Sequence, residues 1–347
     1  MPYDYDCAQE TRAAGGSVVI LIPLFDDWES FAELAPRLDE ALALAGETAD
    51  VLIVDDGSAL EPVEDLGARP FRAIGQIDVL TLRRNLGHQR AIAVGLAFVE
   101  DRLAYDAVVV MDGDGEDRPE DVPRLLARLR DEGERKIVFA ERARRSESLT
   151  FRVNYALYKL LHRVLIGQPV RVGNFSAIPR RRLESLVVVS ELWNHYAAAA
   201  FHSRQPLCTI PTHRGRRLRG RSSMNFVRLV MHGLSAISVY SEILGVRLLV
   251  GAAALAMMAL TGIAATVGIR LMTDLAIPGW ATYTVGCLSI VLLQGVMLAT
   301  TFSFVMLGGR HDAVFLPRRD YAFFVGRMRC LSQAADVTLE SQTAGHG

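Results

Sequence analysis

The chain has 347 residues, which is enough for one large domain or for two of moderate size. Its 38 lysines and arginines nearly balance its 39 aspartates and glutamates, and the resulting net charge of -1 gives no support for bulk nucleic-acid binding, so no nucleic-acid partner is expected. The four cysteines are scattered, and no two have the spacing of metal ligands. The sequence therefore indicates neither a zinc site nor a disulfide framework.

The N-terminal residues 1–16 are polar and acidic. They lack the basic and apolar regions of a secretory signal, so we expect a disordered tail. From residue 17 onward, short apolar runs alternate with amphipathic segments. These patterns predict strands at 18–22, 50–55, 77–82, 107–111, 137–140 and 207–210, and helices at 30–45, 88–101 and 119–132.

This alternation predicts an α/β domain with right-handed crossovers and a mostly parallel sheet. In such sheets, ligands bind beyond the carboxyl ends of the strands. Six polar residues fall at those ends: Asp55, Asp56, Arg84, Asn85, Asp112 and Asp114. We therefore expect one ligand site at this edge of the sheet.

The last third of the chain is strongly apolar, and residues 248–307 contain only Arg270 and Asp274 as charged residues. The run 248–269 is long enough to cross about 30 Å of hydrocarbon, and a second uncharged run follows at 275–309. Arginine-rich segments flank the pair on both sides. The positive-inside rule then predicts a two-helix hairpin with the α/β domain and both termini in the cytoplasm, at the inner membrane in a bacterium. Two buried helices of a soluble domain are the alternative.

An amphipathic stretch precedes the apolar part, and we expect it to form a helix at the membrane surface. The predicted organisation is a tail at 1–16, the α/β domain at 17–224, the surface helix at 225–245, two transmembrane helices at 246–309 and a cytoplasmic tail at 310–347.

An acidic motif, Asp-Gly-Asp-Gly-Glu, directly follows the predicted strand 107–111. Asp112 and Asp114 can both face a hard cation such as Mg²⁺ or Mn²⁺, with Glu116 as a further oxygen donor. Mg²⁺ usually takes one or two carboxylates plus substrate phosphates, so the motif favours a nucleotide-diphosphate substrate whose leaving group the metal neutralises. An EF-hand is excluded because Pro123 stands where its last ligand, a glutamate, is required. An acidic turn that caps the next helix is the alternative.

Two further motifs favour a nucleotide. The carboxylates in Asp55-Asp56-Gly57-Ser58 can accept hydrogen bonds from a base or a ribose, although the same residues also make a good turn. The segment 83–89 offers cations for a diphosphate and the N-terminus of a helix, whose free N–H groups favour anions; a solvated strand end is the alternative. Its candidate contacts are Arg84, Asn85, Gly87 and Gln89.

The basic segment 214–223 can bind a phosphate acceptor through fork-shaped guanidinium groups, with Arg217, Arg219 and Ser222 as candidates. Attraction to anionic lipid headgroups is the alternative, and the two can coexist.

In this order, these motifs resemble those of the family 2 inverting glycosyltransferases. More narrowly, the chain looks like the dolichol- or polyprenyl-phosphate sugar transferases with two C-terminal transmembrane helices. The resemblance implies a GT-A fold, a nucleotide-diphosphate sugar donor and a lipid-phosphate acceptor. By position it also implies contacts of Pro23, Asp27 and Asp55 with the nucleotide, of Asp112, Asp114 and Glu116 with the metal, and of Arg217 and Ser222 with the acceptor phosphate.

We therefore expect an in-line displacement with inversion, in which Asp112, Asp114 and Arg84 act on the diphosphate. Asn174 stands where relatives often carry aspartate, beside the acceptor. A phosphate monoester, with a second pKa near ~6, is already largely an anion and needs positioning more than a base.

Three other functions are compatible with parts of this pattern. A processive polysaccharide synthase is disfavoured because its Q-x-x-R-W motif and additional helices are lacking. A silent scaffold that binds nucleotide-sugar or lipid is disfavoured by the retention of both acidic motifs. A hydroxyl acceptor stays open because of Asn174. The nucleotide and the sugar also stay open, and self-association is compatible with the sequence.

Overall fold

The computed structural model describes residues 18–63, 66, 69–142, 172–219, 234–273, 279–308 and 315–333. The predicted N-terminal tail and Ser222 lie outside these residues. Within them the chain forms two compact units. The first consists of residues 18–142, 172–219, 234–239 and 315–333, and the second of residues 240–273 and 279–308.

The first unit is built on one eight-stranded sheet with the order β7-β5-β6-β4-β1-β2-β3-β8. The strands are β1 (Val18–Leu24), β2 (Ala49–Asp55), β3 (Ile74–Leu82), β4 (Ala107–Val110), β5 (Ile137–Arg142), β6 (Val172–Pro179), β7 (Leu207–Thr212) and β8 (Val325–Gln333). The four central strands β4, β1, β2 and β3 are parallel, β5 is parallel to β7, and β6 and β8 run antiparallel to their neighbours. The predicted mostly parallel sheet, as in a GT-A fold, is confirmed.

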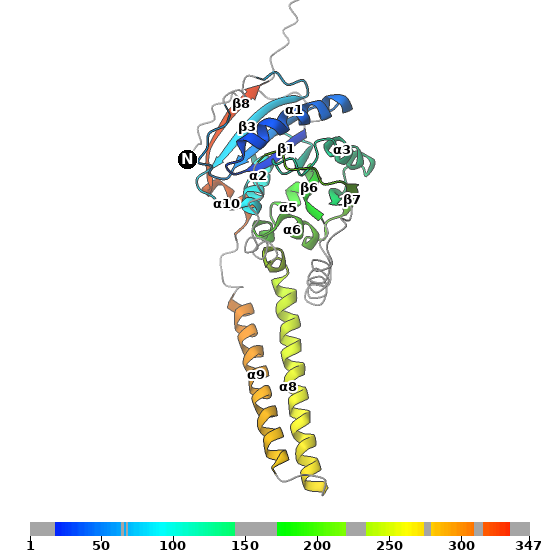
Figure 1. The fold of residues 1–347 in the computed structure, drawn as a ribbon, viewed down its shortest axis with the longest axis vertical. Helices are drawn as coiled ribbons and strands as arrows, with labels where there is room; N and C mark the ends of the chain where they lie inside the picture. Colours follow the sequence, from blue (N-terminus) through cyan, green and yellow to red (C-terminus); the bar gives the residue numbers. More distant parts are fainter. Residues whose placement is uncertain are drawn as a thin grey trace, which may run out of the picture. The chain divides into compact units, whose positions relative to one another are not determined.

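Helices cover both faces of this sheet (Figure 1). Alternate residues of β1 point to opposite faces: Leu21 packs in one apolar cluster, with α2 (His88–Arg102), and Ile22 packs in the other, with α1 (Trp28–Ala45). Because both faces are covered, β1 reads as a continuous apolar run. The remaining helices are α3 (Asp121–Asp131), α5 (Arg180–Leu186), η2 (Ser190–Trp193), α6 (Tyr196–His202), α10 (Pro317–Asp320) and η3 (Tyr321–Phe323).

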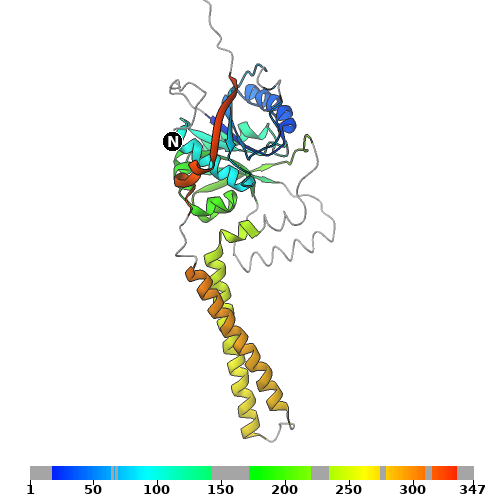
Figure 2. The same ribbon diagram turned by 90° about the vertical axis from the view of Figure 1, so that its left-hand side faces the viewer.

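The C-terminal segment differs from the prediction of a tail at 310–347. Its residues 325–333 form β8, which pairs with the edge of β3 (Figure 2). Before it, Arg318 forms ion pairs with Glu100 and Asp101 at the end of α2. β8 occupies one side of β3, whose backbone groups would otherwise be an open sheet edge. This strand was not predicted, because its arginines were interpreted only as cytoplasmic charges that flank the membrane segment.

The second unit is a pair of long helices, α8 (Ser241–Met272) and α9 (Trp280–Gly308). The buried residues of α8 are small and lie seven apart, at Gly245, Ala252, Ala259 and Thr266, which is the spacing of one packed seam. Within the most apolar 18-residue stretch of each helix, only 17% of the stretch in α8 and 6% of the stretch in α9 is buried. By length and composition both helices can cross a membrane, and their exposure disfavours the alternative of soluble core helices. The first five residues of α8 belong to the stretch predicted as a surface helix, of which 225–233 lie outside the described residues.

We expect Tyr321→Ala to destabilise the first unit. Tyr321 is 4% exposed, packs edge-on against Phe98 and donates a hydrogen bond to Asp101. Loss of a buried aromatic costs about 3 kcal/mol, or roughly 6–12 °C in melting temperature. The measurement is thermal unfolding in detergent. Phe323→Ala is the matched control, because Phe323 is 74% exposed. Equal shifts in the two variants would show that the C-terminal segment does not stabilise the sheet.

Candidate functional site

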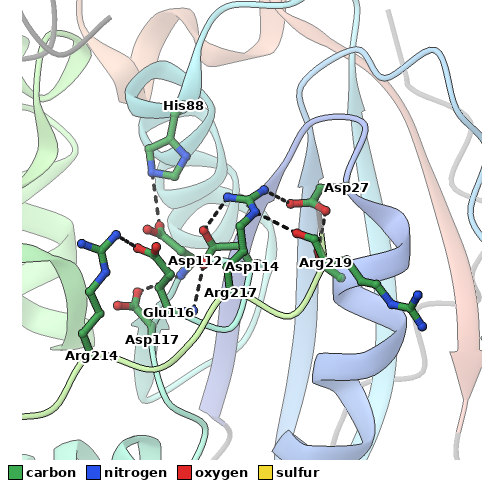
Figure 3. Close-up of polar contacts among 10 residues, drawn as sticks. Asp27, His88, Asp112, Asp114, Glu116, Asp117, Arg214, Arg217 and Arg219 are labelled. Carbon is green, nitrogen blue, oxygen red and sulfur yellow. Dashed lines mark hydrogen bonds and ion pairs between the residues drawn. The ribbon is translucent and has the colours of Figure 1, made fainter. Parts of the chain in front are cut away.

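The acidic motif forms a braced turn at the end of β4 (Figure 3). The N–H of Asp112 donates to Asp117 Oδ2 at 3.0 Å, and the N–H of Glu116 donates to Asp114 Oδ1 at 2.9 Å. Gly115 has φ +82°, a conformation that glycine adopts without strain. Asp117 therefore braces the acidic turn itself, and the N-cap residue of α3 makes no side-chain capping hydrogen bond, so the helix-capping alternative is not observed.

A strap, defined here as residues 213–219, crosses this turn. Its Gly215 N–H donates to the Glu116 carbonyl at 2.8 Å, and its Leu218 N–H donates to the Asp114 carbonyl at 2.9 Å. A Cβ on Gly215 would lie 2.3 Å from the carbonyl oxygen of Gly115, and a Cβ on Gly115 would lie 2.5 Å from Leu218 Cγ. Both glycines are thus required for the close approach of the strap.

Arginines of the strap neutralise the acidic turn and its surroundings. Arg217 lies between two carboxylates, with Nη1 2.9 Å from Asp114 Oδ2 and Nη2 2.5 Å from Asp27 Oδ2 (Figure 3). Arg214 forms an ion pair with Glu116. The structure thus brings together residues that are far apart in the chain. Arg219 instead pairs with Glu33 on α1, and its predicted contact with an acceptor stays a prediction.

His88, the first residue of α2, joins the site although the sequence analysis did not select it. Its Nε2 lies 3.3 Å from Asp112 Oδ1 and 3.0 Å from Asn174 Nδ2. Gln89 ties this group to the fold: its Nε2 donates to Asn174 Oδ1 at 3.1 Å, and its Oε1 accepts the N–H of Tyr196 at 2.8 Å. Both the nitrogen and the oxygen of the Gln89 side-chain amide are therefore hydrogen-bonded within the protein.

The pKa of His88 is raised above its ordinary value of 6.5. Partial desolvation of the His88 side chain, which is still 43% exposed, lowers the pKa, but the carboxylates of Asp112, Asp117 and Asp114 outweigh this effect. The signal that could have found His88 is its position at the start of a helix, next to a glycine and facing the acidic motif.

The second acidic motif mainly shapes the neighbouring turn. Asp56 is 3% exposed, and its two oxygens accept the N–H groups of Leu86 and Gly87 at 2.7 and 2.8 Å. Burial raises the pKa of Asp56, although these two bonds lower it. Asp55 accepts the N–H of Ser58 at 3.0 Å. The turn alternative is thus observed, and nucleotide contacts of the two aspartates stay predictions.

The remaining predicted nucleotide contacts lie at the same edge of the sheet or within it. Arg84 and Asn85 are exposed on the loop between β3 and α2. Gly87 has φ +93° and precedes the first turn of α2. Pro23 is buried within β1.

The carboxylates of the acidic turn suit a hard cation in their chemistry, and the guanidinium on Asp114 demonstrates that positive charge is accommodated there. Within the part of the chain that the structure describes, no three side chains of histidine, cysteine, aspartate or glutamate form a metal-binding group. The predicted third ligand, Glu116, is paired with Arg214.

Residues 19–186 match the model of the family described as Glycosyl transferase family 2. Among curated proteins, the undecaprenyl-phosphate 4-deoxy-4-formamido-L-arabinose transferase of Enterobacter sp. (strain 638) is 28% identical over 218 residues, which cover 61% of this chain and 64% of that protein. The protein with the same name from Salmonella paratyphi B is 28% identical over 217 residues, with the same coverage. The match therefore spans less than two thirds of the length of these relatives.

Among solved structures, mannosyl-3-phosphoglycerate synthase from Rubrobacter xylanophilus has a TM-score of 0.45 and 14% identity, over 65% of this chain and 73% of that chain. Glucosyl-3-phosphoglycerate synthase from Mycobacterium tuberculosis, solved with Mn²⁺ and UDP-glucose, has a TM-score of 0.41 and 17% identity, over 67% of this chain and 80% of that chain.

We expect Asp112→Asn to lower the pKa of His88, because it removes the nearest carboxylate charge. The attraction of this pair stabilises the fold fully below pH 6.5 and is lost as the pH rises through the raised pKa. Histidine NMR titration of the full chain measures the change, with His88→Gln to assign the signal. Asp131→Asn, at the end of α3, is the control. An unchanged His88 titration in Asp112→Asn would contradict the assigned cause.

Proposed function

We propose that this chain, which carries a family 2 glycosyltransferase domain, transfers a sugar with inversion from a nucleotide-diphosphate donor to a membrane lipid phosphate of the polyprenyl type. The curated relatives named above are undecaprenyl-phosphate transferases, which supports this choice of acceptor. The observation that carries the proposal is the acidic turn after β4 with the arginine strap bound across it. It combines ligands for a cation with donors for a phosphate in one small region.

On the donor side, Asp112 and Asp114 are the residues that would hold Mg²⁺ or Mn²⁺. A bound cation of this kind neutralises negative charge on the diphosphate leaving group. Arg84 and the free N–H groups at the start of α2 would bind the diphosphate from the loop after β3. Asp27 and Asp55 remain the candidates for the nucleoside.

On the acceptor side, Arg217 would bind and orient the phosphate, together with Ser222 of the predicted set. A phosphate monoester is already an anionic nucleophile at neutral pH, since its second pKa is about 6. The neutral amide of Asn174 is compatible with such an acceptor, because no hydroxyl has to be deprotonated. Its contacts to His88 and Gln89 give it a positioning role beside Asp112.

The membrane part fits a lipid substrate. We propose that α8 and α9 span the membrane, because each is long, apolar and largely exposed along its most apolar window. The arginines on both flanks of the pair favour a cytoplasmic position for the sugar-transferring domain. A nucleotide-sugar made in the cytoplasm would then reach the domain directly.

The test is to incubate the purified full chain with undecaprenyl phosphate, Mg²⁺ or Mn²⁺, and a panel of UDP-, GDP- and dTDP-sugars. We expect a lipid-linked sugar and an equal amount of free nucleoside diphosphate. A hydroxyl-bearing lipid without phosphate serves as the competing acceptor. Product on that lipid alone would contradict the acceptor class, and absence of product with every donor would favour the silent scaffold.

We expect Asp112→Asn to reduce turnover by about 10²-fold or more, because the charge that holds the cation is lost. Its melting temperature should fall only slightly, since the Asp112 side chain pairs with an exposed His88 and the backbone N–H keeps its bond to Asp117. Asp131→Asn, an exposed carboxylate at the end of α3, is the matched control. Retained turnover in Asp112→Asn would contradict the assignment.

A further inference from the structure

Arg217 lies on one of the carboxylates assigned to the cation. We propose that it is a gate: it occupies Asp114 until an acceptor phosphate draws it away, so that cation and acceptor bind cooperatively. This inference rests on the proposed function, because it needs a cation at Asp114 and a phosphate on the strap.

The contacts of Arg217 put its two roles in competition at Asp114. Its Nη1 donates to Asp114 Oδ2, its Nη2 to Asp27 Oδ2, and its Nε to the Arg219 carbonyl at 2.9 Å. Each nitrogen of the guanidinium therefore already has a partner in the protein, although Nη1 and Nη2 each keep a second N–H. A phosphate that binds through Nη1 and Nη2 competes with Asp114 and Asp27 for the same guanidinium charge.

The oxygens of Asp114 are equally engaged. Oδ1 accepts the Glu116 N–H, and Oδ2 holds Arg217. A cation that takes Oδ2 as a ligand has to displace the guanidinium, because two positive groups at one oxygen repel each other. The side chain of Asp114 is only 17% exposed, so water screens this repulsion weakly.

The position of the strap does not depend on Arg217 alone. Two backbone hydrogen bonds and the contact of Leu218 with Gly115 hold it on the acidic turn. A side chain at position 215 would clash with the acidic turn and so displace the strap without changing any charge. With the strap on the turn, Arg217 is paired with Asp114. An acceptor phosphate would offer the guanidinium an alternative anionic partner.

The test measures Mn²⁺ binding to the full chain by electron paramagnetic resonance, without donor. We expect Arg217→Gln to bind Mn²⁺ about 5-fold more tightly or better, a typical size for coupling between two sites. Gly215→Ala should act in the same direction with all charges kept, because its Cβ cannot fit against the turn. Arg219→Gln is the matched control: it removes the same charge from the same strap, but its partner is Glu33.

A second arm adds undecaprenyl phosphate or inorganic phosphate. Either source of phosphate should tighten Mn²⁺ binding to the original chain, and neither should tighten it in Arg217→Gln. An effect of the lipid alone assigns the gate to the lipid acceptor, and an effect of both assigns it to the phosphate group.

The outcomes separate this inference from the proposed function. If Asp112→Asn abolishes Mn²⁺ binding while Arg217→Gln and Gly215→Ala bind like the original chain, the gate is overturned and the cation assignment stands. If Asp112→Asn binds Mn²⁺ as the original chain does, the cation assignment itself fails, and the gate fails with it. If Arg219→Gln tightens binding as much as Arg217→Gln, loss of net charge explains the effect and the gate is likewise overturned.

Discussion

The site depends on keeping several carboxylates close together at the end of one strand. Asp112, Asp114 and Glu116 belong to one turn, and Asp27 reaches the same place from the start of α1. Like charges at this separation repel, and partial burial strengthens the repulsion. The turn is stable because backbone N–H groups bind some of the oxygens and the arginines of the strap neutralise others. Charge balance is therefore the constraint that both the fold and the chemistry must meet.

The sheet supplies the rigid support for this arrangement. Its central strands are buried on both faces and end at the edge where the acidic turn, the Asp55-Asp56 turn and the start of α2 meet. Asp56 joins two of these loops through its hydrogen bonds to Leu86 and Gly87. These hydrogen bonds hold the two loops together at this edge of the sheet.

The sequence allowed the strand and helix order and the edge of the sheet that carries the site to be predicted, because apolar periodicity and strand-end residues are local signals. It could not reveal that Arg217 touches both Asp27 and Asp114, since these residues are 190 and 103 positions away from it. β8 was not predicted because the arginines after residue 309 were interpreted only as a flank of the membrane segment, whereas residues 325–333 also form a strand of the sheet. His88 was not predicted because its place at the start of a helix, beside a glycine, is only a weak signal, and its contact with Asp112 spans 24 positions of the sequence.

We propose that, during the reaction, the acidic turn holds a cation in place of the Arg217 guanidinium. The most direct measurement is an experimental structure of the full chain with Mn²⁺, a donor nucleotide and undecaprenyl phosphate, with the ion located by anomalous scattering. We expect Mn²⁺ to lie beside Asp112 and Asp114, and Arg217 to bind the acceptor phosphate. An ion elsewhere, or an Arg217–Asp114 pair that persists beside the bound ion, would contradict it.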